Sequence, residues 1–138
     1  MTDHYRPPAV PRPLRVLILG AAEPAWYQEA PDVQQEYVLP AMFSCFRRWS
    51  EEMGARCLGT FDDDLFMVGT PRTRQWSFYL LYEVPDLETI TAMINLLRTP
   101  IGGIRLDRYF RAEALVGRGF FPVEAPPDTD GGTDKTTG

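Results

Sequence analysis

Apolar residues recur at two spacings along the first half of the chain. Residues 14–21, "LRVLILGA", form a short apolar run ended by a glycine, which is typical of a central β-strand. Between Asp32 and Met53 the apolar positions recur every three or four residues, and this predicts a helix that ends before Gly54. Pro40 lies inside the pattern, so we expect a kink or a new helix start there.

The second half reads mainly as strands. The runs "ARCLGTF" and "LFMVGT" flank three consecutive aspartates, which predicts a hairpin with the carboxylates at its tip. After a loop at 71–74, "WSFYLLYEV" predicts a further strand. Asp86 is a candidate N-cap for a helix through Arg98, and "DRYFRAEALVG" predicts the last strand.

This order of elements predicts an α+β fold. The sequence β, long α, β-hairpin, β, α, β is the ferredoxin-like βαββαβ arrangement, with both helices on one face of an antiparallel sheet. By analogy with proteins of this layout, we expect the other face to be covered by a second copy, giving a homodimeric α+β barrel around a cavity. We expect one domain at 14–121, with a flexible leader at 1–13 and a flexible tail at 122–138, both rich in Pro, Gly, Thr or Asp.

Composition excludes several classes of function. The net charge of -5 and the pI of about 4.8 argue against a nucleic-acid partner. No apolar run is long enough to span a bilayer, so we expect a cytoplasmic protein without a membrane partner.

The scarcity of histidine and cysteine narrows the chemistry further. The only histidine, His4, lies in the leader, and Cys45 and Cys57 are expected to be packed free thiols rather than a disulfide or a zinc site. A Ser-His-Asp triad, haem and zinc are therefore not expected. Oxygen-ligated Mg or Ca has no recognisable loop, because Asp62 to Asp64 lack the glycine and distal glutamate of an EF-hand. We expect no metal and no cofactor.

Alternation in the last two strands defines a candidate site. Phe110, Ala112, Ala114 and Val116 should face the helices, while the other face carries Asp107, Tyr109, Arg111, Glu113 and Leu115. In the preceding strand Tyr79 belongs to the same polar face. One interpretation is a solvated face or intersubunit ion pair in which Arg111 and Glu113 neutralise each other. The other makes Arg111 a stabiliser of an anion or enolate, and Glu113 or Tyr109 the proton-transfer group.

The succession "LGTFDDD", "MVG", "VPDL", "NLLR" and "YFRAEALVGR" resembles the IacB-like family, small proteins encoded with the enzymes of bacterial indole-3-acetate degradation. The resemblance covers residues 58–118 and the long helix only loosely. It implies the dimeric α+β barrel class and a role near aromatic or hydrophobic small molecules, and it transfers no catalytic assignment. The matching positions that carry functional groups are Asp62, Asp63, Asp64, Asn95, Arg98, Tyr109, Arg111 and Glu113. The leader and the Asp/Gly/Thr tail depart from the family.

Together these features predict a small-molecule tailoring protein. It would bind an aromatic or hydrophobic metabolite and act by cofactor-independent oxygenation, isomerisation or cyclisation, with Arg111, Glu113 and Tyr109 as catalytic candidates. The alternative is a non-catalytic accessory protein that binds a pathway intermediate or a partner enzyme. The substrate-binding candidates are Trp76, Tyr79, Asp62, Asp64, Asn95 and Arg98. A turn is the best explanation of the aspartates, although three adjacent acids exceed what a turn needs, so Asp62 and Asp64 stay candidates. An exposed helix position would explain Asn95, and a favourable helix-dipole contact would explain Arg98.

Overall fold

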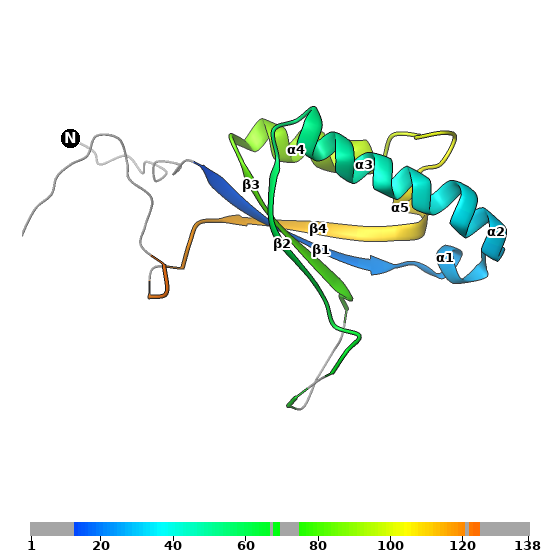
Figure 1. The fold of residues 1–138 in the computed structure, drawn as a ribbon, viewed down its shortest axis with the longest axis horizontal. Helices are drawn as coiled ribbons and strands as arrows, with labels where there is room; N and C mark the ends of the chain where they lie inside the picture. The colour runs from blue at the N-terminus through cyan, green and yellow to red at the C-terminus, as the bar shows by residue number, and fades with distance from the viewer. Residues whose placement is uncertain (1–12, 67, 70–74, 121, 125–138) are drawn as a thin grey trace, which may run out of the picture.

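Four strands form one antiparallel sheet, and the two longest helices lie over one of its faces (Figure 1). The structure, a computed structural model, describes residues 13–66, 68–69, 75–120 and 122–124. The elements follow in the order β1 (Leu14–Ala22), α1 (Pro24–Gln28), α2 (Pro31–Val33), the π-helix η1 (Gln34–Val38), α3 (Leu39–Glu51), β2 (Arg56–Asp62), β3 (Phe78–Val84), α4 (Leu87–Leu97), α5 (Leu106–Tyr109) and β4 (Phe110–Gly117). The strand order β2-β3-β1-β4 is that of a ferredoxin-like fold, so the predicted α+β class is confirmed.

The long helical segment changes type at the expected proline. The π-helix ends at Val38 and α3 begins at Leu39, directly before Pro40. Proline has no N–H to continue an α-helical ladder, and in the wider turn before it the N–H of Leu39 donates to the carbonyl of Gln34. Beyond the C-terminal end of α3, Gly54 takes a φ of 74°, in the left-handed region that glycine adopts without strain.

The core lies between the sheet and the two long helices. Trp49 of α3 is fully buried, and its indole N–H donates to the backbone carbonyl of Met93 in α4 at 3.1 Å. Its ring also packs edge-on against Tyr82 of β3, with centroids 5.5 Å apart. One side chain therefore joins both helices and the sheet. Asp86 caps α4 as predicted, because its carboxylate accepts from the N–H of Thr89 at 2.8 Å.

Three local predictions are wrong. The strand β1 does not end at Gly20 but continues to Ala22, because the missing side chain leaves room for the ring of Phe78; a Cβ at Gly20 would lie 2.2 Å from it. The run "LFMVGT" contributes no strand among its described residues, and β2 pairs with β3 instead. Cys57 is exposed rather than packed, whereas Cys45 is buried.

The predicted leader and tail lie mostly outside the described residues. The first described part of the tail contacts the domain, since the guanidinium of Arg15 on β1 forms two hydrogen bonds with the carboxylate of Glu124. This carboxylate also lies against Gly119, where a Cβ would come within 3.0 Å of it. No helix in the described part of the chain is long and apolar enough to cross a membrane.

Candidate functional site

One face of the sheet is turned away from α3 and α4 (Figure 1), and we call it the open face. It carries both apolar and charged side chains. Its residues alternate along each strand with the buried ones that meet the helices. They are Arg15, Leu17 and Leu19 of β1, Tyr79, Leu81 and Glu83 of β3, and Arg111, Glu113 and Leu115 of β4. The predicted division of the last two strands is confirmed for these residues.

Strand register arranges the open face in rows. Leu17 of β1 lies between Leu81 and Leu115, which gives an apolar row across three strands. In the next row Leu19 lies between Tyr79 and Glu113. Each neighbouring strand adds one spacing, so the backbones at Tyr79 and Glu113 are about 10 Å apart. The face therefore presents an apolar floor with a phenol on one side and a carboxylate on the other.

Arg111 lies at the end of this face and already has several partners. Its guanidinium donates to Glu23 at 3.4 Å and to the backbone carbonyl of Gln75, and it lies over the ring of Trp76, 5.2 Å from the centroid. The ion pair with Glu23 is partly exposed, so water screens it and it contributes little stability. Trp76, a predicted substrate-binding residue, precedes β3 and lies against the guanidinium of Arg111. These contacts hold the guanidinium in place beside the apolar rows.

Tyr109 does not belong to the open face. It ends α5, is buried, and donates its hydroxyl to Glu29 at 2.7 Å. This hydrogen bond, together with burial, raises the pKa of the phenol, so the group stays protonated and is unsuited to act as a base. Asp107 also lies in α5 rather than on the last strand, where it pairs with Arg105. The alternation rule failed here because the strand begins only at Phe110.

The other predicted residues are dispersed. Asn95 and the C-cap residue Arg98 are exposed on α4, in the helix layer and away from the open face. Asp62 ends β2 at the opposite sheet edge from Arg111, and its carboxylate accepts the N–H of Asp64 at 3.1 Å. This is an Asx turn, so the aspartates serve the turn that leaves β2, at the start of a long connection rather than at a hairpin tip.

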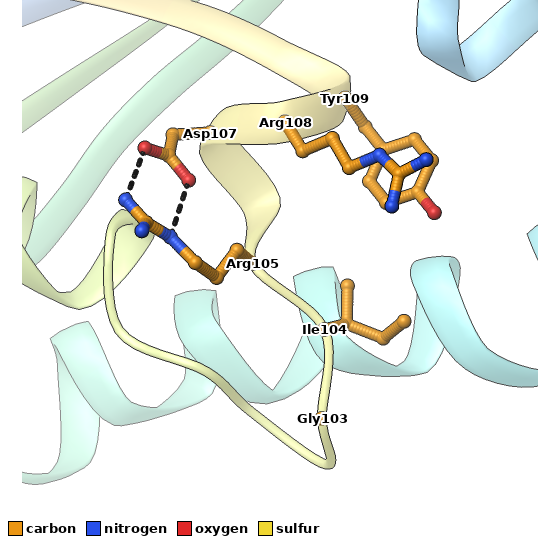
Figure 2. Close-up of a pocket in the computed structure, with 6 residues that line it drawn as sticks. All are labelled: Gly103, Ile104, Arg105, Asp107, Arg108 and Tyr109. Atoms are coloured by element: carbon orange, nitrogen blue, oxygen red, sulfur yellow. Dashed lines mark hydrogen bonds and ion pairs between the residues drawn. The ribbon is translucent and has the colours of Figure 1, made fainter.

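Two further hollows were not indicated by the sequence. A gap between the sheet and the helices is lined by Phe46, Trp49 and Phe110 among others. Its volume of about 20 Å³ is too small to accept the aromatic ring of a ligand. A groove of about 550 Å³ runs along α5 and the loop before it (Figure 2). In it Arg105 is tied to Asp107 at 2.7 Å, and Arg108 lies over the ring of Tyr109 at 5.5 Å.

The remaining candidates for reactive groups are the buried thiol of Cys45 and clusters of possible metal ligands. Burial raises the pKa of Cys45 to about 12, so its thiol is a protonated core group. Within the described ranges, no group of three His, Cys, Asp or Glu side chains is arranged to hold a metal ion.

The chain has an α+β fold with a ferredoxin-like sheet, and this fold is similar to that of several solved structures. The methylated RPA0582 protein is 18% identical to this chain, with a TM-score of 0.50 over 80% of this chain and 83% of its own. A candidate chlorite dismutase, TA0507, is 23% identical, with a TM-score of 0.49 over 80% of this chain, and this chain spans 46% of its length. The RPA0582 protein of unknown function from Rhodopseudomonas palustris is 19% identical, with a TM-score of 0.43 over 74% of this chain and 79% of its own. No family model and no curated protein matches the sequence. The similarity concerns the fold alone.

Proposed function

We propose that the chain forms a homodimer through its open faces and there binds an aromatic or hydrophobic metabolite, on which it acts by proton transfer. The observation that carries the proposal is the composition of the open face. An apolar row through Leu17 lies beside a row containing Tyr79 and Glu113, with Arg111 at its end. Apolar and charged side chains gathered on one uncovered sheet face favour an enclosed binding site over a plain solvated surface.

The two charged residues take complementary roles in this proposal. Arg111 would bind a carboxylate or enolate oxygen of the ligand, because its exposed pair with Glu23 can exchange for a ligand anion. Glu113, about 7 Å along the same face of β4, would remove a proton from carbon. Isomerisation, cyclisation or oxygenation can follow from such a carbanion or enolate. Tyr109 has no part in this step, because its buried hydroxyl is held by Glu29.

A second candidate function is a non-catalytic accessory protein that binds an intermediate. It is favoured by the contacts of Arg111, whose guanidinium is already occupied by Glu23, Gln75 and Trp76. Such an arginine would keep its contacts within the protein and contribute its shape and charge to a binding site, without taking part in a reaction.

Ligand binding can be tested without knowing the substrate. Thermal unfolding is followed with indole, indole-3-acetate and polycyclic aromatic acids. Saturable stabilisation is expected, about 2.7 kcal/mol at a ligand concentration of 100 Kd. Arg111→Met should weaken binding of the acids and leave that of neutral indole unchanged. If no compound in the set stabilises the protein, the proposed function is wrong.

Proton transfer has its own readout. Deuterium incorporation at the carbon next to the ligand carboxylate is measured by NMR in D2O. We expect the wild type to accelerate it and Glu113→Gln to reduce the rate about a hundredfold or more, as is common when a general base is lost. Glu88→Gln, an exposed position in the first turn of α4, is the matched control and should exchange at the wild-type rate. Binding without any accelerated exchange would favour the accessory protein.

A further inference from the structure

The connection that leaves β2 carries exposed apolar side chains. We call the described residues 63–66 and 68–69, which follow the end of β2, the arm; the arm extends to the side away from the helices (Figure 1). Leu65 is 95% exposed, Phe66 80% and Phe61 61%, and the carboxylates of Asp62 and Asp64 lie among them around a hollow of about 620 Å³. Adjacent apolar side chains this exposed mark an interaction surface.

The groove along α5 has the complementary character. Ile104 and the buried Tyr109 supply its apolar wall, and the exposed Arg108 supplies positive charge (Figure 2). Arg105 also lines the groove, where its charge is paired with that of Asp107. The guanidinium carbon of Arg108 lies 5.5 Å from the centroid of the Tyr109 ring, so this charge lies beside the apolar wall. The groove therefore suits a segment that combines apolar side chains with carboxylates.

Strand direction brings the arm and the groove to the same end of the sheet. The strand β2 is antiparallel to β3, and β1 is antiparallel to both β3 and β4, so β2 and β4 run in opposite directions. The arm follows the end of β2, and α5 directly precedes the start of β4. Within one chain the two strands are the opposite edges of the sheet, about 14 Å apart over three strand spacings.

Closing two such sheets into a barrel changes this relation. If a two-fold rotation about the barrel axis relates the two copies, the strands β2-β3-β1-β4 of one copy are followed around the barrel by the same four strands of the other. The β2 edge of each copy then meets the β4 edge of the other, and the arm of one arrives beside the α5 groove of the other. The rotation repeats the contact, so each dimer contains it twice.

We propose that the arm of each protomer docks in the α5 groove of a second copy of this chain. Phe66 and Leu65 would cover the apolar wall, and Asp64 would face Arg108. This inference rests on the proposed homodimer, and it adds a contact outside the ligand-binding open face. Its function is to close the end of the barrel and fix the register of the two sheets.

Zero-length cross-linking tests the contact directly. The chain contains a single lysine, Lys135, so Arg108→Lys places one new amine in the groove. A carbodiimide joins this amine to a nearby carboxylate as an amide, with loss of one water. In a mixture of 14N- and 15N-labelled protein, mass spectrometry should find mixed-isotope pairs linking position 108 to Asp64 or Asp62. Arg118→Lys, exposed just beyond the other end of β4, is the control and should give none.

Charge reversal gives an independent test. Asp64→Arg leaves the turn-forming carboxylate of Asp62 in place, and we expect it to raise the dimer Kd about tenfold, because it opposes like charges at two symmetric contacts. Adding Arg108→Glu should restore wild-type affinity. A stable dimer with neither the cross-link nor this rescue would overturn arm docking and leave the proposed function intact, whereas a monomer at micromolar concentration would overturn both.

Discussion

Replacing Leu115 by threonine tests whether the open face is the dimer interface. Leu115 lies in the apolar row beside Leu17 and is 57% exposed in the single chain. Threonine is β-branched and therefore favours a strand, and it introduces a polar group on a face that water reaches in the monomer. The fold of the monomer should therefore survive, and the cost should appear in association.

The magnitude follows from the exposed fraction. Full burial of a leucine side chain contributes roughly 1.5 to 3 kcal/mol, and 57% of it remains to be buried by a partner. An isologous interface contains the residue twice, so the loss is about 2 to 3 kcal/mol per dimer. This corresponds to a rise in dimer Kd of roughly 30- to 150-fold.

Sedimentation equilibrium over a dilution series measures this shift, and light scattering of the wild type should give twice the 15.7 kDa chain mass. The control is Leu87→Thr, since Leu87 is 48% exposed at the start of α4 in the helix layer. It should leave the dimer Kd unchanged. A wild-type dimer that is insensitive to Leu115→Thr but weakened by Leu87→Thr would place the interface on the helices and refute the barrel.

Three further predictions concern stability. Trp49→Phe should lower the free energy of unfolding, measured in urea titrations, by about 2 kcal/mol or more, because it removes a buried 3.1 Å hydrogen bond and leaves a cavity. A loss under about 0.5 kcal/mol would show that the core repacks around the smaller ring. The hydrogen bond from Arg15 and its positive charge lower the pKa of Glu124 in the folded protein. The ionised carboxylate therefore stabilises the fold fully at pH values above its ordinary pKa of 4.5. This stabilisation is lost as the pH falls through the lowered pKa of the folded state. Wild type and Glu124→Gln should therefore converge in melting temperature at low pH, and a constant difference would contradict the linkage. Deleting 1–12 and 125–138 should leave the melting temperature nearly unchanged in calorimetry, while a loss of many degrees would show that one of these segments docks.

Much of the fold was predictable because it depends on local periodicity. The apolar residues that recur every three or four positions, among them Cys45 and Trp49, predicted the helix α3 and the side that it buries. The side chain of Asp86 was enough to predict where α4 begins, because aspartate is a preferred N-cap residue. The two-residue alternation separated Phe110 from Arg111 correctly. Where local chemistry was ambiguous the prediction failed, as at "LFMVGT", whose described residues 65–66 and 68–69 pair with no strand despite their β preference.

The sequence by itself determined the approximate positions of the two long helices and of the strands, and the faces that they bury in the core, because each depends on residue type and spacing. Only the tertiary structure decided which charged groups lie together. It buried Tyr109 against Glu29, eighty positions away, and stacked Trp76 on Arg111 from a different strand end. It also placed the arm and the α5 groove at one end of the sheet. Such relations depend on strand pairing and chain direction across the whole sheet, and no local pattern encodes them.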